Sequence, residues 1–324
     1  MCTAVCYQTK DHYFGRNLDL EYGYNETVTI TPRNFPFEFH TAGSLLGHYA
    51  MIGMATVVNG YPLYYEATNE KGLSMAGLNF PGNAVYQPPH QDKTNVASFE
   101  FIPWILGQCS DLREVRVLLE RLNLTNISFN PELPPTPLHW LISDREQSIV
   151  VEPMADGLHI SENPVGVLTN NPPFEFHLQN LGQYLNTSPA QPESRFSSHF
   201  SMTPWSSGMG GLGLPGDFSS ASRFVKAAFV KLNSMSGNSE EESVSQFFRI
   251  LSSVAMPRGS VITDHGKPDI TRYSCCCNTD KGIYYYQTYD NSRIHGVDLH
   301  REDLEGSDLL TFPLITHEPI SIQN

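Results

Sequence analysis

Predicted strands dominate the first part of this chain, predicted helices follow in the middle, and strands return toward the C-terminus. Residues 13–31 read as a strand, a turn and a second strand, in which Val28 and Ile30 alternate with threonines. A further strand is implied at the extreme N-terminus. This order argues against a series of parallel βαβ units and predicts an α+β chain with layered antiparallel sheets.

Apolar and β-branched segments continue the strand pattern through the first half of the chain. Turn residues such as Asn59-Gly60 separate three of these segments, which is typical of an antiparallel meander. The predicted strands cover residues 50–58, 62–67, 73–79, 138–143, 147–152 and 165–169.

Amphipathic spacing predicts helices from Asp111 to Leu122, over 220–232 and over 239–254. A hairpin follows, formed by residues 272–278 and 282–290 around a short polar turn. We therefore expect one α+β domain over the whole chain, 1–324, which is long enough to bury a substantial core.

Two stretches are too rich in proline or glycine to continue a regular element. Residues 128–137 and 207–217 are predicted to be loops, which is the ordinary outcome for such composition. The proline-rich segment also carries Phe129 and Leu133, with Leu138 just after it, so it could form a wall of an apolar pocket.

Charge and the N-terminal segment exclude several classes of function. Acidic residues outnumber basic ones by 34 to 20, which gives a net charge of −14 and opposes binding to nucleic acid or to an anionic membrane surface. The N-terminus lacks the basic start and apolar stretch of a secretory signal, and no run of about 18 apolar residues occurs later. A cytoplasmic, soluble protein is expected.

The cysteines and histidines show no metal-site pattern. Six cysteines lack CxxC spacing and twelve histidines are scattered, so we expect reduced thiols, no metal and no cofactor. A triplet of cysteines at 275–277 could suggest redox or metal chemistry, but its place in a predicted strand favours buried small side chains.

Cys2 is unusual because of its position. Methionine is normally removed before a residue this small, which would leave a thiol and a free α-amine on the same residue. An α-amine titrates near pH 8, so it can accept the thiol proton at neutral pH. A cysteine beside the start codon is also common by chance, and position alone does not establish a nucleophile.

Polar side chains elsewhere could complete such a site, although each has an ordinary explanation. Arg16 and Asp19 could return beside Cys2 on a neighbouring strand and lower the pKa of its thiol, or could form a surface ion pair. Asn79 ends an apolar strand at a turn, where amides usually satisfy backbone groups, but an amide N–H there could also hold an oxyanion.

Two further segments carry polar residues that could have either a catalytic role or an ordinary structural one. Asn170 and Asn171 follow a predicted strand, and either amide could donate to a developing oxyanion. Arg223 opens a predicted helix, where an arginine is by default a solvated surface cation.

Together these segments resemble the choloylglycine hydrolase family, which contains bile salt hydrolases and penicillin V acylases. The resemblance extends over nearly the whole chain and rests on the combination of motifs in their order. They are Cys2, Phe14-Gly15-Arg16-Asn17-Leu18-Asp19, Gly77-Leu78-Asn79-Phe80, Leu168-Thr169-Asn170-Asn171-Pro172 and Ser220-Ala221-Ser222-Arg223-Phe224.

The resemblance implies a fold and a set of roles. The fold would be that of an N-terminal nucleophile hydrolase, an αββα sandwich of two antiparallel sheets between helical layers, assembled as a homotetramer. Cys2 would be the nucleophile and its amine the base, with the catalytic set completed by Arg16, Asp19, Asn79, Asn170 and Arg223. Asn170 aligns with the single asparagine of relatives, and Asn171 remains the alternative.

The implied reaction is hydrolysis of the amide bond of a glycine- or taurine-conjugated bile salt. Asn79 resembles the bile salt hydrolases, whereas penicillin V acylases tend to carry tyrosine there. Penicillin V or another N-acyl amide is the alternative substrate, and a catalytically silent bile-acid-binding protein is a third hypothesis. Candidates to line an apolar steroid pocket are Leu18, Leu20, Tyr24, Phe129, Leu133 and Leu138.

Overall fold

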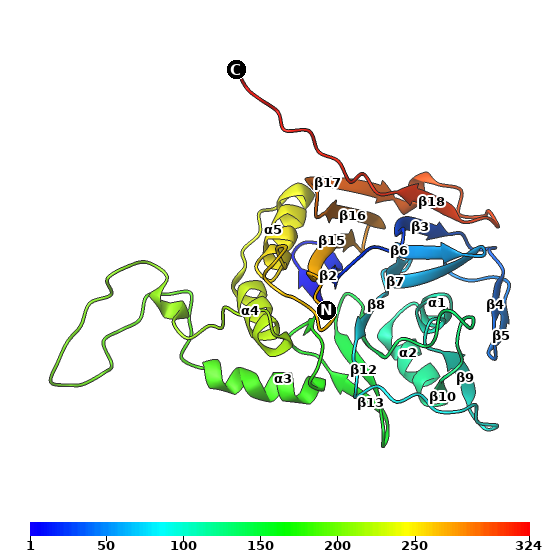
Figure 1. Cartoon of the computed structure of the whole chain (residues 1–324), viewed down its shortest axis with the longest axis horizontal. Coiled ribbons are helices and arrows are strands. Elements are labelled where there is room, and N and C mark those ends of the chain that lie inside the picture. The colour runs from blue at the N-terminus through cyan, green and yellow to red at the C-terminus, as the bar shows by residue number, and fades with distance from the viewer.

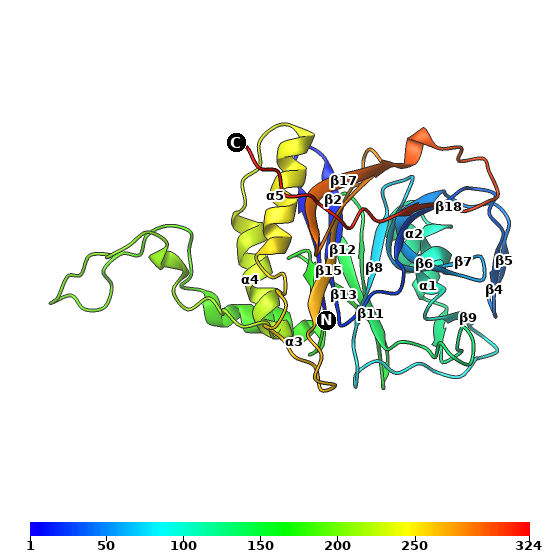
Figure 2. The same cartoon turned by 45° about the horizontal axis from the view of Figure 1, so that its top comes forward.

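A computed structural model describes residues 1–324. Two antiparallel β-sheets stack against each other, and helices cover the outer face of each sheet (Figures 1 and 2). This four-layer arrangement agrees with the αββα sandwich that the sequence predicts.

The first sheet brings the two ends of the chain together. Its six strands lie in the order β14-β1-β2-β15-β16-β17, so the N-terminal hairpin of β1 and β2 sits between β14 and the C-terminal strands. The strands are β1 (Cys2–Gln8), β2 (His12–Leu20), β14 (Val167–Leu168), β15 (Ile270–Asn278), β16 (Ile283–Thr288) and β17 (Asn291–Asp298).

The second sheet has eight strands in the order β13-β12-β11-β8-β7-β6-β3-β18. Asn59 and Gly60 join β6 to β7 with positive φ angles of 52° and 79°, which is the tight hairpin turn that this dipeptide predicts. The strands are β3 (Thr27–Thr31), β6 (Met51–Val58), β7 (Tyr61–Asn69), β8 (Ser74–Asn79), β11 (Leu138–Ser143), β12 (Ser148–Met154), β13 (Gly157–Glu162) and β18 (Leu310–Pro313).

The helices pack on the outer faces, and two small strand pairs complete the fold. α4 and α5 lie on the first sheet, α3 packs beside α4, and α1 packs on the second sheet. The helices are α1 (Phe101–Leu106), α2 (Leu112–Leu119), α3 (Phe174–Asn180), α4 (Ser220–Asn233) and α5 (Glu240–Ser252). The pairs are β4 (Phe37–Phe39) with β5 (Gly43–Leu45), and β9 (Thr94–Ala97) with β10 (Leu122–Thr125).

Two buried clusters hold the layers together. A cluster of 37 residues joins the inner faces of both sheets and the helices over the first sheet, whereas a cluster of 24 residues lies between the second sheet and α1 and α2. All six cysteines are unpaired and buried, including the triplet on β15. None of the helices is both long and apolar enough to span a bilayer.

Most of the predicted elements are present, but one boundary was wrong. The helix predicted from Asp111 to Leu122 ends at Leu119, and Leu122 instead begins β10. β10 pairs in parallel with β9, so a tertiary contact overrides the local helical spacing there. Helices α1 and α3 were also not predicted, and neither were the strands β4, β5, β9, β10, β13, β17 and β18.

Candidate active site

Cys2 is the first residue of β1, inside the first sheet. β1 lies between β14 and β2, and the Cα atom of Cys2 pairs with that of Leu18. Cys2 is only 3% exposed. The ammonium nitrogen of Met1 lies 2.6 Å from the carbonyl oxygen of Asp19 and 3.3 Å from the carboxylate of Asp269. With Met1 present, the nitrogen of Cys2 is an amide, and the charged amine is one residue away.

The side chain of Asn170 links this nitrogen to the end of β8. Its Oδ1 accepts hydrogen bonds from the Cys2 N–H at 2.8 Å and from Nη2 of Arg223 at 2.7 Å, while its Nδ2 donates to the carbonyl of Asn79 at 2.8 Å. Because Oδ1 meets two donors and Nδ2 meets an acceptor, these partners fix the orientation of the amide. The second hydrogen of Nδ2 is left for another acceptor.

Asn171 points to a different partner. Its Nδ2 donates to the carbonyl of Pro81 at 2.6 Å, in a bond at the protein surface. The side chain of Asn79 is also exposed, at the last position of β8. Asn79 therefore meets Asn170 through its backbone, and of the two asparagines in the doublet only Asn170 contacts Cys2.

Arg223 anchors the first residue of β1 from the helical layer. It lies in the first turn of α4, where the side chain of Ser219 caps the helix. Its guanidinium donates to the carbonyl of Cys2, to Oγ1 of Thr3 at 2.7 Å and to the carbonyl of Phe218 at 3.0 Å. This arginine is buried, unlike the solvated cation that is usual at such a position.

Asp19 lies close to the same cluster from β2. Thr271 on β15 donates to its Oδ1 at 2.6 Å, and the other carboxylate oxygen has no hydrogen-bond partner in the protein. Burial raises the pKa of the Asp19 carboxyl, although the positive charge of Arg223 and the N-terminal ammonium act to lower it. Burial likewise lowers the pKa of Arg223, against the attraction of Asp19. The two charges thus support each other's ionisation.

Arg16 approaches Cys2 from the space between the two sheets. It pairs with Ala4, so its side chain lies on the same face of the sheet as Cys2. Its Nη1 crosses to the second sheet and donates to the carbonyls of Gly77 at 2.6 Å and Tyr65 at 3.0 Å. The side chain is completely buried, and Nη2 has no partner in the protein.

Glu66 on β7 is the counter-ion of Arg16, and the sequence analysis missed it. Its carboxylate lies 3.7 Å from Nη1 of Arg16 and accepts hydrogen bonds from the hydroxyls of Tyr273 at 2.8 Å and Tyr284 at 2.6 Å. Burial acts to lower the pKa of Arg16, but Cys2, Tyr273 and Glu66 outweigh it, so the pKa is raised and the charge is retained. A lone carboxylate within an apolar strand was the available signal.

Two buried histidines, also missed, hold the segment that carries Asn170. Nε2 of His139 lies 2.8 Å from the carbonyl of Thr169, and its Nδ1 lies 2.9 Å from Glu152. Nε2 of His177 lies 2.9 Å from the carbonyl of Asn170. Burial lowers the pKa of His177, which favours the neutral ring with a proton on Nε2. These contacts fix the loop after β14 from both sides.

Some of the apolar residues predicted for the substrate pocket lie beside the polar cluster. Leu18 is opposite Cys2 but is almost fully buried, and Leu20 at the end of the same strand is half-buried. Leu138 on β11 pairs with Asn79 and is also half-buried. These three side chains come from strands that carry or adjoin the predicted catalytic residues.

The other three lie on loops. Tyr24 is 44% exposed and packs near Tyr22, with ring centroids 5.2 Å apart. Phe129 packs against Phe99 and Tyr61, with centroid separations of 5.2 and 5.8 Å. Leu133 is half-buried in the same proline-rich loop. These ring contacts are with neighbouring aromatic side chains, and the role of the three residues in the substrate pocket stays a prediction.

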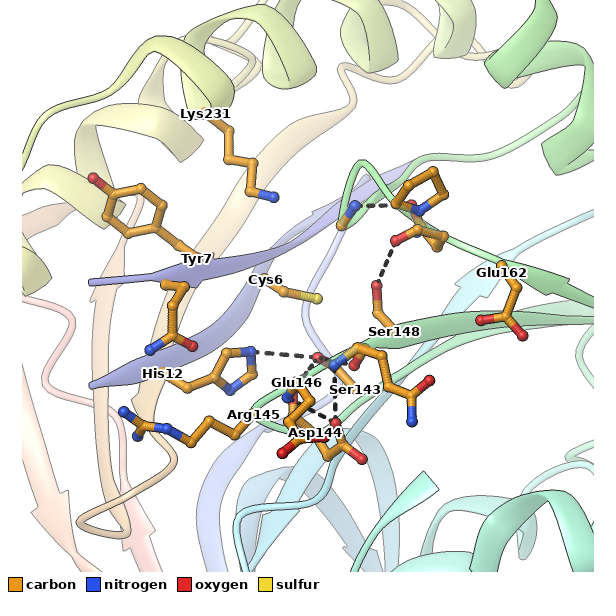
Figure 3. Close-up of a pocket in the computed structure, with 15 residues that line it drawn as sticks. Cys6, Tyr7, His12, Ser143, Asp144, Arg145, Glu146, Ser148, Glu162 and Lys231 are labelled. Carbon is orange, nitrogen blue, oxygen red and sulfur yellow. Dashed lines mark hydrogen bonds between the residues drawn. The ribbon is translucent and has the colours of Figure 1, made fainter. Parts of the chain in front are cut away.

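A polar cavity of about 300 Å³ opens near the other end of β1 and is separate from this cluster. Figure 3 shows Lys231 reaching from its helix toward the strand that carries Cys6, with Ser143 and His12 on the opposite side. Burial raises the pKa of the Cys6 thiol and lowers the pKa of His12 to about 4. Cys6 therefore sits in a setting that disfavours a thiolate.

Comparison with known proteins identifies the family. Residues 2–312 match the model described as linear amide C–N hydrolases, choloylglycine hydrolase family. The chain belongs to the choloylglycine hydrolase family. This confirms the resemblance found in the sequence and the reaction class, hydrolysis of linear amides.

Relatives and solved structures agree. A protein of Lactiplantibacillus plantarum named bile salt hydrolase/transferase is 54% identical over 314 residues, 97% of each chain. A crystal structure of a cysteine-to-alanine mutant of conjugated bile acid hydrolase from Clostridium perfringens is 38% identical, with a TM-score of 0.93 over 100% of both chains. Penicillin V acylase from Agrobacterium tumefaciens, 18% identical with a TM-score of 0.74 over 96% and 91% of the chains, shares the fold. The N-terminal nucleophile hydrolase fold is thereby confirmed.

Proposed function

We propose that this choloylglycine hydrolase cleaves the amide bond of glycine- or taurine-conjugated bile salts and releases the free bile acid and the amino acid. The observation that carries the proposal is the contact between the Cys2 nitrogen and Oδ1 of Asn170, at 2.8 Å. It puts the group that becomes the α-amine beside a fixed acceptor, next to the thiol. The bile salt is inferred from the name of the L. plantarum relative, at 54% identity.

In the proposed mechanism the mature chain starts at Cys2. Removal of Met1 turns the Cys2 nitrogen into an amine, and Oδ1 of Asn170 and the Arg223 contact to the Cys2 carbonyl hold that residue in place. The amine takes the thiol proton, directly or through water, and the thiolate attacks the amide carbonyl. The buried charge of Arg16, on the same face, favours the thiolate.

Hydrolysis then proceeds in two steps, formation of a thioester and its reaction with water. The second Nδ2 hydrogen of Asn170 and the N–H groups of Asn79 are the proposed oxyanion donors. The carboxylate of Asp19 is proposed to balance the positive charge of Arg223. The departing amine takes the proton from the α-ammonium and leaves an acyl thioester on Cys2. Water activated by the amine hydrolyses the thioester. Attack by another amine instead would give acyl transfer, the second activity in the name of the L. plantarum relative.

The two asparagines of the doublet are expected to differ sharply in their effect on activity. Asn170→Ala removes both the acceptor for the amine and a donor for the oxyanion, so kcat should fall about 100-fold or more. Asn171→Ala removes only the bond to Pro81 and should stay within about 3-fold of wild type, as expected of a surface change. Steady-state rates of both variants, compared at matched thermal stability, measure this; equal losses would contradict the assignment.

The substrate assignment is tested with wild-type protein under reducing conditions at mildly acidic pH. Free taurine and glycine are measured after incubation with taurocholate and glycocholate, and amine release from penicillin V is measured in parallel. Release from the bile salts supports the proposal. Cleavage of penicillin V alone would assign the N-acyl amide alternative, and binding of cholate without any cleavage would indicate a silent binding protein.

The steroid is proposed to bind against apolar side chains at this end of the sheets. Burying a few hundred Å² of a rigid apolar body contributes on the order of 5–8 kcal/mol before ordering costs. Five of the proposed lining residues retain partial exposure, and they come from the end of β2, the loop after it, the proline-rich loop and the start of β11. The proposed set is Leu18, Leu20, Tyr24, Phe129, Leu133 and Leu138.

A homotetramer is proposed on the basis of a long arm that leaves the body of the molecule between α3 and α4. Figures 1 and 2 show this segment extending well beyond the helices. Phe196 and Trp205 on the arm are 83% and 82% exposed, and Leu185, Phe200 and Leu212 are exposed as well. Large apolar side chains displayed in this way favour burial against another subunit.

The arm makes a measurable prediction about assembly. Wild type is expected to have a mass in solution of about four times 36.3 kDa, and a Phe196→Ser/Trp205→Ser double variant should shift toward smaller species. Light scattering behind size exclusion measures both. A wild-type monomer, or an unchanged mass in the variant, would overturn the role of the arm. Val117→Ser, at an exposed apolar side chain on α2, is the matched control.

We propose further that the protein is a single domain working in the cytoplasm. Both sheets draw strands from the N- and C-terminal parts of the chain, so no cut separates two independent cores. Six unpaired cysteines, three of them adjacent on β15, fit a reducing compartment.

A further inference from the structure

Arg16 is held in place almost entirely by the second sheet. Its Nη1 makes three contacts there, with the carbonyls of Tyr65 and Gly77 and with the carboxylate of Glu66. Two of these partners are backbone groups, so Glu66 is the only one that carries a charge. Nη2 of Arg16 is buried without a partner in the protein.

Glu66 is itself fixed by donors from the first sheet. The hydroxyls of Tyr273 and Tyr284 donate to its two oxygens at 2.8 and 2.6 Å, and the thiol of Cys275 lies 3.5 Å from one of them. Burial raises the pKa of the Glu66 carboxyl, whereas Arg16 and the hydrogen bonds from Tyr284, Tyr273 and Cys275 act to lower it and favour the ionised form. Glu66 is therefore built into the layer between the sheets.

A buried ion pair of this kind usually contributes little to the stability of the folded chain, so its presence suggests a functional role. Burial removes both charges from water, and a well-packed apolar pair would often be more stable. The pair lies on the face of the first sheet to which Cys2 also belongs. Its net charge and its geometry therefore bear directly on the thiol.

We infer that Glu66 is a positioning residue for the amidase reaction, which holds Arg16 and sets how much of its positive charge Cys2 experiences. This inference rests on the proposed role of Cys2 as nucleophile. Glu66 makes no hydrogen bond to the thiol of Cys2, and it is not proposed to touch the substrate. It acts through Arg16, supported by Tyr273 and Tyr284.

The charges around the ion pair predict in which direction the pKa of the Cys2 thiol should change when Glu66 is replaced. The titratable or charged groups that face the pair are Arg16 on β2, Tyr273 and Cys275 on β15, Tyr284 on β16 and Cys2 on β1. Replacing Glu66 by glutamine removes the negative charge and leaves Arg16 unbalanced. The thiolate of Cys2 should then form at lower pH, while the freed guanidinium should lose its orientation.

The experiment uses full-length Glu66→Gln and wild type with a free Cys2 amine. The rate of Cys2 alkylation by iodoacetamide is followed against pH by mass spectrometry of the N-terminal peptide. The midpoint is expected to shift by about half a pH unit or more toward lower pH. Taurine release from taurocholate should show kcat lowered by about 5-fold or more with KM nearly unchanged, since a misplaced catalytic group affects the reaction step.

A milder variant and a matched control keep the test decisive. Tyr284→Phe removes one donor to Glu66 and should shift the same midpoint in the same direction by less, even if Glu66→Gln folds poorly. Glu70→Gln breaks another glutamate–arginine pair, with Arg33, away from Cys2, and should leave the midpoint in place.

The outcomes separate this inference from the proposed mechanism. An unmoved midpoint in both Glu66→Gln and Tyr284→Phe would overturn the positioning role, and so would an equal shift in Glu70→Gln. Activity retained by Cys2→Ser would instead overturn the mechanism. A silent Cys2→Ser combined with an unmoved midpoint would leave the mechanism standing and remove only the role of Glu66.

Discussion

Cys2→Ser is expected to abolish amide hydrolysis, with kcat/KM lowered by about 1,000-fold or more, as for loss of a covalent nucleophile. A serine hydroxyl ionises far less readily than a thiol and is the weaker nucleophile in a site built around a thiolate. The substitution is nearly isosteric, so the contacts of the Cys2 backbone with Asn170 and Arg223 should persist. Taurine release from taurocholate by the purified variant measures the effect.

Cys6→Ser is the matched control for this loss. Cys6 lies on the same strand and is almost as buried, at 6% against 3% exposed, but it borders the separate polar cavity. Its substitution should leave kcat/KM within about 3-fold of wild type, with some loss of thermal stability. If Cys2→Ser kept most of its activity, or if both variants lost it equally, Cys2 could not be the nucleophile.

The fold was predictable where the signal is local. Alternation of apolar residues and the Asn59-Gly60 turn marked most of the strands of both sheets. The strands of the two large sheets that were missed, β13, β17 and β18, are edge strands with mostly exposed or half-buried side chains, so they lack a clear apolar pattern. The end of α2 was misplaced because β10 forms only through pairing with β9, more than twenty residues away in the chain.

The residues of the candidate active site also differ in how far the local sequence predicts them. Arg16 and Asp19 were predictable as neighbours of Cys2, because a short hairpin brings β2 back alongside β1. Asn170 and Arg223 have ordinary local settings, and only the family resemblance singled them out. Glu66 was visible in the sequence only as a lone carboxylate in an apolar strand. Its role was not predictable, because its partners come from other strands and meet only when the two sheets stack.

Met1 occupies the position that decides whether Cys2 can act. In this form of the chain its carbonyl accepts from the N–H of Asp19 at 2.9 Å, and its ammonium lies beside Asp269. Met1 thus extends the pairing of β1 with β2 by one residue. An amide nitrogen has no available lone pair, so Cys2 lacks its base while Met1 is attached.

Retention of Met1 is therefore expected to lower kcat by about 100-fold or more, the usual contribution of a general base. A fusion with a cleavable N-terminal extension tests this within one preparation, since a site-specific protease can expose Cys2 as the first residue. Taurine release should be near background before cleavage and should appear in step with the free Cys2 terminus, as followed by mass spectrometry. Removal of the extension returns the amine to Oδ1 of Asn170 without altering any other side chain. Full activity of a chain with intact Met1 would overturn the amine-as-base mechanism, whereas the loss of activity in Cys2→Ser would still identify the thiol as the nucleophile.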